Sequence, residues 1–134
     1  MAPETQLRTA LIADAALSAL VGARIYAGLI PQNSVMPAIA FERISTQPRD
    51  SAMGKDTGYV QATVQYTCIA ENDAHGAGYD QAAAVAEALR HVVQRFRSAG
   101  PVLEVFIDGE LVTYEPDTLR HSRVLDIDIR FLES

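Results

Sequence analysis

The amino-acid sequence predicts an α+β domain, in which a mixed or mostly antiparallel sheet of four to five strands carries an N-terminal helix and one long helix on one face. Two patterns lead to this prediction. Apolar residues recur at helical spacing in residues 78–97, and they alternate with polar residues in residues 59–70 and 124–132. The expected order is helix, strand, strand, helix, strand, strand, strand. A chain of 134 residues is expected to form a single domain, residues 1–134.

The long helix, residues 78–97, is the element on which the fold prediction depends most. Its apolar residues fall on one stripe of a helix with about 3.6 residues per turn; they are Ala82, Val85, Ala86, Leu89, Val92, Val93 and Phe96. Acidic residues come early and basic residues late, as the helix dipole favours. Gly100 and Pro101 follow and cannot continue the helix. A stripe of this length has to be buried, and the strands on either side are expected to bury it.

The N-terminal part is expected to contain helix and then a short edge strand. Residues 3–21 predict helix, with Asp14 able to cap a second short helix and Gly22 ending it. Residues 24–26 predict the short strand, and residues 38–46 predict a longer one. Ile44 has the wrong parity in that strand, which indicates a bulge or a two-sided environment.

Residues 45–58 are predicted to form a long flexible loop within the domain. The segment contains Pro48 and two glycines, and its only large apolar residue is Met53. Loops of this length in compact domains are usually functional or disordered. We therefore take its charged and apolar residues as assembly-interface candidates: Arg49, Asp50, Met53, Lys55 and Asp56.

The C-terminal part predicts two short strands, residues 102–107 and 111–114, joined by a hairpin at Asp108-Gly109. Residues 124–132 predict the last strand, with its apolar residues facing inward. Its outward residues Asp126, Asp128 and Arg130 complete the list of interface candidates.

Net charge and cysteine content exclude several classes of protein. The net charge of −6 disfavours free nucleic acid as a partner. Residues 101–134 hold eight acids and three bases, so this acidic quarter is either a solvated face or a surface for a basic partner.

The one cysteine excludes an internal disulfide and indicates a reducing compartment. No apolar stretch approaches the length of a membrane span, about 20 residues, and we expect a protein made and assembled in a cytoplasm.

No residue pattern predicts catalysis, a cofactor or a metal. Gly76-Ala77-Gly78 opens the long helix as a dinucleotide-binding turn would, but Gln81 stands where the third glycine belongs. Cys68 is expected to be a core residue. The histidines 75, 91 and 121 lack a metal-ligand spacing. Asp126 and Asp128 share a strand face and can bind a cation or run acid–base chemistry, yet Arg130 continues their row and favours a solvated or interface face.

Taken together, the segments resemble the tail-completion or tail-terminator (head–tail joining) proteins of long-tailed bacteriophages and prophages. The resemblance spans about residues 7–131 and depends on the order and spacing of short motifs. These motifs are Leu11–Gly22 (LIADAALSALVG), Arg24-Ile25-Tyr26, Pro31-Gln32, Met36-Pro37-Ala38-Ile39 and Phe41-Glu42-Arg43-Ile44-Ser45. An alternating strand, an alanine-rich helix and a closing pair of strands follow, as in the family.

The resemblance implies a structural role without enzymatic activity. Family members are similar in forming a ring, typically of six subunits, on the head-proximal end of the tail tube. The ring ends tube growth and offers a surface to the head connector. The implied partners are copies of the chain itself, the tail-tube protein and the head connector, and the implied location is the virion tail, assembled in the host cytoplasm.

Two other hypotheses remain open from the sequence. One is a small cytoplasmic enzyme or ligand-binding α+β domain with its site at Asp126, Asp128 and the loop. The other is a regulatory adaptor that binds an unrelated host protein. Rings or concentration-dependent oligomers favour the assembly protein over both.

Overall fold

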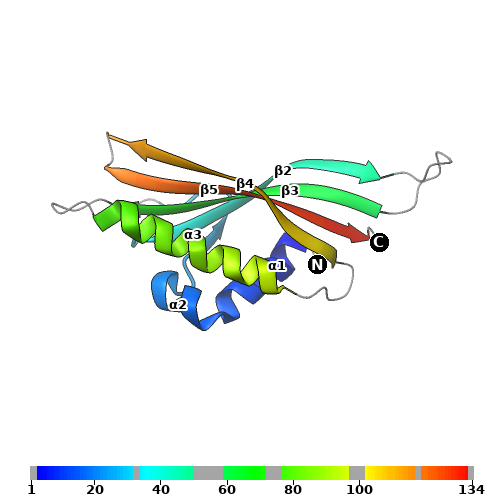
Figure 1. Ribbon diagram of the computed structural model, residues 1–134, viewed down its shortest axis with the longest axis horizontal. Helices are drawn as coiled ribbons and strands as arrows, with labels where there is room; N and C mark the ends of the chain where they lie inside the picture. Colours follow the sequence, from blue (N-terminus) through cyan, green and yellow to red (C-terminus); the bar gives the residue numbers. More distant parts are fainter. Residues whose placement is uncertain are drawn as a thin grey trace.

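The computed structural model describes residues 3–31, 34–49, 59–71, 77–96, 102–116 and 119–132. These residues form three helices and five strands, and all three helices lie on one side of the sheet (Figure 1). In chain order they are α1 (Pro3–Ala13), α2 (Ala15–Val21), β1 (Ile25–Ala27), β2 (Ala38–Arg49), β3 (Tyr59–Glu71), α3 (Ala77–Arg95), β4 (Val102–Glu115) and β5 (Arg120–Leu132). The α+β class and the helix placement predicted from the sequence are confirmed.

The sheet is mixed, with strand order β1-β2-β3-β5-β4. β1 pairs with β2 in parallel, and every other pair is antiparallel. β3 and β5 pair along their whole length, from Tyr59 opposite Leu132 to Glu71 opposite Arg120. The sheet is strongly twisted. Figure 1 shows this twist, since the order of the strands from top to bottom reverses between the two ends of the sheet.

The core lies between α3, the α1–α2 pair and the inner face of the sheet. The apolar stripe of α3 is buried as predicted, from Ala82 to Val93. The alternating residues of β3 and β5 oppose it; those fully buried include Val64, Tyr66, Cys68, Leu125, Ile127 and Ile129. The 3.6-residue period of α3 and the two-residue period of the strands therefore meet at one apolar layer. No helix in the described part of the chain is long and apolar enough to cross a membrane.

Asp14 separates α1 from α2 by capping the second helix. Its backbone is extended, with φ −75° and ψ 124°, and its carboxylate accepts a hydrogen bond of 2.9 Å from the Leu17 N–H. At the other end of α2, Gly22 adopts a positive φ of 58°, which glycine reaches without the steric cost of a side chain. Both features agree with the sequence prediction of a capped second helix.

The hairpin predicted at Asp108-Gly109 is wrong. β4 runs without interruption from Val102 to Glu115, and its register against β5 shifts between Ile107 and Gly109. The Asp-Gly pair therefore belongs to a β-bulge, in which β4 carries one extra residue relative to β5. β5 also begins earlier than predicted, at Arg120, so the antiparallel pair is formed by β4 and β5.

The predicted 45–58 loop is shorter than expected, because its first five residues, 45–49, belong to β2. They pair with the first residues of β3, and the register shifts between Arg43 and Ser45. Ile44 thus sits at the bulge that its parity indicated. The candidates Asp50, Met53, Lys55 and Asp56 lie outside the described residues, as do His75 and Gly76. The flexibility of residues 50–58 stays a prediction.

Candidate assembly surfaces

The predicted row Asp126, Asp128 and Arg130 lies on the sheet face that points away from the helices. Each side chain contacts the neighbouring strand. The Thr63 hydroxyl donates to the Asp128 carboxylate at 2.7 Å, and the Gln65 amide donates to Asp126 at 3.4 Å. Arg130 donates to the Gln61 side chain at 3.4 Å. The structure therefore brings the three predicted residues together as one hydrogen-bonded row along β5.

Asp128 departs from the prediction of a solvated or interface position, since it is only 6% exposed. Thr63 and Phe106 are its cross-strand neighbours on β3 and β4, and Arg130 stacks over the Phe106 ring at 5.2 Å. These side chains shield the carboxylate, and the Thr63 hydrogen bond compensates for part of its lost hydration. Asp128 is therefore better suited to holding the sheet together than to meeting a partner directly.

The described residues hold no metal-binding cluster of three or more histidines, cysteines and acids. Cys68 is fully buried. Burial, with a smaller effect from Glu110, raises the pKa of the Cys68 thiol far above its ordinary value, so the thiol stays protonated and unreactive. The sequence interpretation of Cys68 as a small core residue is confirmed.

Arg49 ends β2 opposite Tyr59 in the backbone ladder. It is thus on the sheet and apart from the Asp126–Arg130 row, which lies two strands away in the strand order. The structure does not unite the two predicted groups of interface residues at one described site.

Exposed apolar side chains mark a first surface, at the C-terminal end of β4. We define the β4 edge surface as Leu111, Val112, Tyr114 and Tyr79, which are 61%, 46%, 45% and 49% exposed. Tyr114 packs against His121 with ring centroids 4.4 Å apart and the rings tilted by 36°, and His121 meets the Tyr79 ring edge-on at 5.7 Å. These contacts hold aromatic side chains from α3, β4 and β5 in one exposed cluster.

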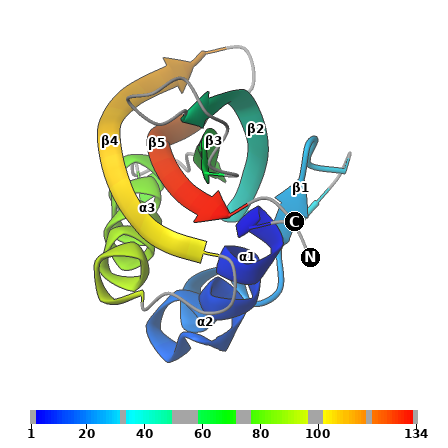
Figure 2. The same cartoon turned by 90° about the vertical axis from the view of Figure 1, so that its right-hand side faces the viewer.

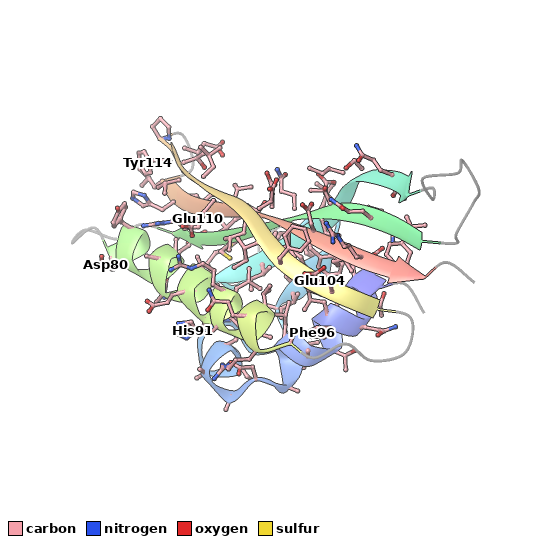
Figure 3. All side chains as sticks on the ribbon, turned by 45° about the vertical axis from the view of Figure 1, so that its right-hand side comes forward. Asp80, His91, Phe96, Glu104, Glu110 and Tyr114 are labelled. Atoms are coloured by element: carbon pink, nitrogen blue, oxygen red, sulfur yellow. The ribbon has the colours of Figure 1, made fainter. Side chains whose placement is uncertain are left out.

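Charged residues brace this cluster from the helix side. Glu110 lies between β4 and α3 (Figure 3), at 3.9 Å from the Arg90 guanidinium and 4.0 Å from that of Arg123. Arg123 also stacks over the Tyr79 ring at 5.2 Å. Tyrosine and arginine side chains are enriched at protein–protein interfaces. Here the contacts within the subunit already hold them in place.

Further exposed apolar side chains are spread along the other side of the sheet. We define the β2 edge surface as Leu29, Val35 and Ile44, which are 90%, 65% and 49% exposed. Leu29 and Val35 belong to the connection from β1 to β2, and Ile44 is the bulge residue of β2. Sequence reasoning missed both edge surfaces. The signal that was present is the adjacent pair Leu111-Val112, which gives a strand apolar residues on both faces.

A shallow groove lies between α1 and the C-terminal end of α3. Its lining residues are Ala10, Ala13, Asp14, Val92, Arg95 and Phe96, and its two charged residues pair with each other at 3.5 Å. The groove is mainly apolar and offers no converging set of unpaired polar groups of the kind that fixes a small ligand. The described surface thus combines exposed apolar side chains at the two sides of the sheet with this mainly apolar groove.

The sequence matches the family described as "Tail completion protein gp17" over residues 5–132. The chain belongs to this family, and its coarse function follows: it is a structural protein of phage-type tails. The family resemblance predicted from the sequence is confirmed.

The fold is also similar to a chain in a solved structure described as "Virion of native gene transfer agent (GTA) particle". The TM-score is 0.71 at 20% sequence identity, and the match covers 94% of this chain and 91% of the other. At 20% sequence identity this likeness is evidence for the fold alone. No curated protein matches the sequence.

Proposed function

We propose that this protein forms a ring, of six copies, at the head-proximal end of a phage-type tail. The ring ends growth of the tail tube and joins the tail to the head connector. The observation that carries this proposal is membership of the tail completion family over residues 5–132. The partners are copies of the chain, the tail-tube protein and the connector, and assembly takes place in the host cytoplasm.

The surface chemistry supports a role in binding other proteins. Two groups of exposed apolar side chains, the β4 and β2 edge surfaces, lie outside the core. Scattered apolar residues are ordinary on a monomer, but an ordered aromatic cluster on an edge strand is typical of an interaction site. The same fold occurs in a chain of a virion structure, over 94% of this chain. We propose no catalytic residue, cofactor or metal for this function.

The segment between β2 and β3, residues 50–58, is proposed to become ordered against a neighbouring subunit or the tube. It holds Asp50, Lys55 and Asp56 with one large apolar residue. Fixing a residue's backbone costs roughly 1–2 kcal/mol, and few apolar contacts within the chain offset that cost. A partner would offset it with ion pairs and backbone hydrogen bonds.

Deletion of the gene from the phage or prophage that encodes it tests the proposal. We expect full heads and separate tails that fail to join, with joining restored by the wild-type protein supplied in trans. Normal numbers of joined particles in the deletion strain would contradict the proposal. Restoration by the Asp126→Asn/Asp128→Asn variant would support a role without acid–base chemistry.

A further inference from the structure

The sheet has two open edges, on opposite sides of the molecule. Among the described residues β4 pairs with β5 alone, and β2 beyond Phe41 pairs with β3 alone, because β1 ends at Ala27. Figure 2 shows β4 on one side of the molecule and β1 on the other. Residues 42–47 and 108–116 are all exposed, so both edges are accessible to another strand.

Both edges keep only part of the protection that monomeric proteins usually give an exposed strand: a bulge at Ile44 beside Arg43 in β2, and a bulge between Ile107 and Gly109 in β4. Lysine, arginine and proline, which block pairing at edges, are absent from β4, Val102–Glu115. β4 exposes Leu111, Val112 and Tyr114 instead, and β2 exposes Ile44. Pro48 has no N–H to donate, which limits the available stretch of β2 to residues 42–47.

The charges near the two edges are partly complementary. Asp108 and Glu115 of β4 have no ion-pair partner in the described part of the chain. Near the β1–β2 edge, the Arg8 guanidinium donates to the Ile25 carbonyl, and that of Arg24 donates to the Pro37 and Leu20 carbonyls. Neither arginine has a carboxylate partner among the described residues. The β4 edge thus offers two unpaired acids, and the β1–β2 edge offers two arginines without a carboxylate partner beside one exposed acid, Glu42.

We infer that subunits join edge to edge, with β4 of one copy pairing with residues 42–47 of β2 in the next copy. This inference rests on the proposed ring and names its contact. The two edges differ, so the contact is head-to-tail, the type of contact that closes into a ring. A β4-to-β4 contact would place Asp108 and Glu115 against the same acids of the other copy, which disfavours it.

Edge-blocking variants, studied by size-exclusion chromatography with light scattering, test the inference. Leu111→Lys/Thr113→Lys blocks β4, and Ile44→Lys/Gln47→Lys blocks β2. The control Ala84→Lys/Gln94→Lys adds the same charge at exposed positions of α3. We expect the wild type and the control to assemble. Each edge variant alone should remain monomeric at concentrations about tenfold or more above the wild-type midpoint, since lysines weaken edge pairing.

Mixing the two edge variants gives the sharpest result. Each keeps one intact edge, so an equal mixture should form heterodimers and nothing larger. Edge variants that assemble as well as the control would overturn the inference while leaving the ring intact. A wild-type protein that stays monomeric would overturn the ring and the edge contact together.

If circular dichroism shows that a lysine variant does not fold, a second pair of substitutions tests the edge-to-edge contact. Asp108→Asn/Glu115→Gln removes the two unpaired acids at exposed positions. Assembly of this variant should be weaker than that of the wild type and less sensitive to salt, since exposed charges are screened by salt. An unchanged salt dependence would contradict the charge complementarity of the two edges.

Discussion

Leu89→Ala is expected to destabilise the protein by about 3–4 kcal/mol. Leu89 is fully buried in the middle of the α3 stripe and belongs to the core that β3 and β5 complete. The substitution removes three carbon groups, worth about 2.4 kcal/mol at roughly 0.8 kcal/mol each. A cavity adds to this loss at about 24 cal/mol per Å³, because the strands opposite are held by their ladders and cannot collapse onto α3.

Urea unfolding followed by circular dichroism measures this loss, at one fixed protein concentration because assembly also stabilises the folded state. The matched control is Gln94→Ala, an exposed position on the same helix, for which we expect a change within about 0.5 kcal/mol. A loss below about 0.5 kcal/mol for Leu89→Ala would mean that this stripe does not form the core.

Three further predictions concern buried groups, and a fourth concerns the β2–β3 connection. Asp128→Asn should cost about 1–2 kcal/mol in urea unfolding, since its short hydrogen bond loses a charged acceptor; no change would mean that the carboxylate is solvated. Tyr66→Phe should be neutral or stabilising by up to about 1–2 kcal/mol, since the buried Tyr66 hydroxyl has no hydrogen-bond partner among the described residues; a loss above about 1 kcal/mol would reveal one. Burial raises the pKa of the Cys68 thiol, so the unfolded chain loses this proton first and stability should fall as pH rises above about 8.5. In the Cys68→Ala variant, the free energy of unfolding should decrease less steeply between about pH 8 and 9.5. An unchanged slope would mean that other groups cause the decrease. Hydrogen exchange should show little protection across residues 50–58 in the free subunit, and strong protection in a demonstrated monomer would refute ordering on assembly.

Periodic elements could be predicted from the sequence because their signals are local. The stripe of α3 and the alternation of β3 and β5 depend on residues within one element, and the structure confirms all three. The cap at Asp14 is local as well. Asp108-Gly109 was misassigned because the same dipeptide suits a tight hairpin turn and a bulge. Pairing with a distant strand decides between these two outcomes.

The edge surfaces and the burial of Asp128 could not be predicted because they depend on strand order. β5 inserts between β3 and β4, which leaves β4 at an edge and places Thr63 beside Asp128 across 65 residues of sequence. The sequence pattern of β4 is compatible with a central or an edge position. Only the pairing of the strands distinguishes a central strand from an edge strand.

The location of the protein in assembled particles tests the central claim most directly. The measurement is negative-stain electron microscopy of purified particles and free tails, with a gold-labelled antibody against a small epitope tag on this protein. We predict label at the head-proximal end of the tail, at the junction with the head in complete particles. Label along the tube or at the distal tip, or tails that carry none, would contradict a tail-completion role.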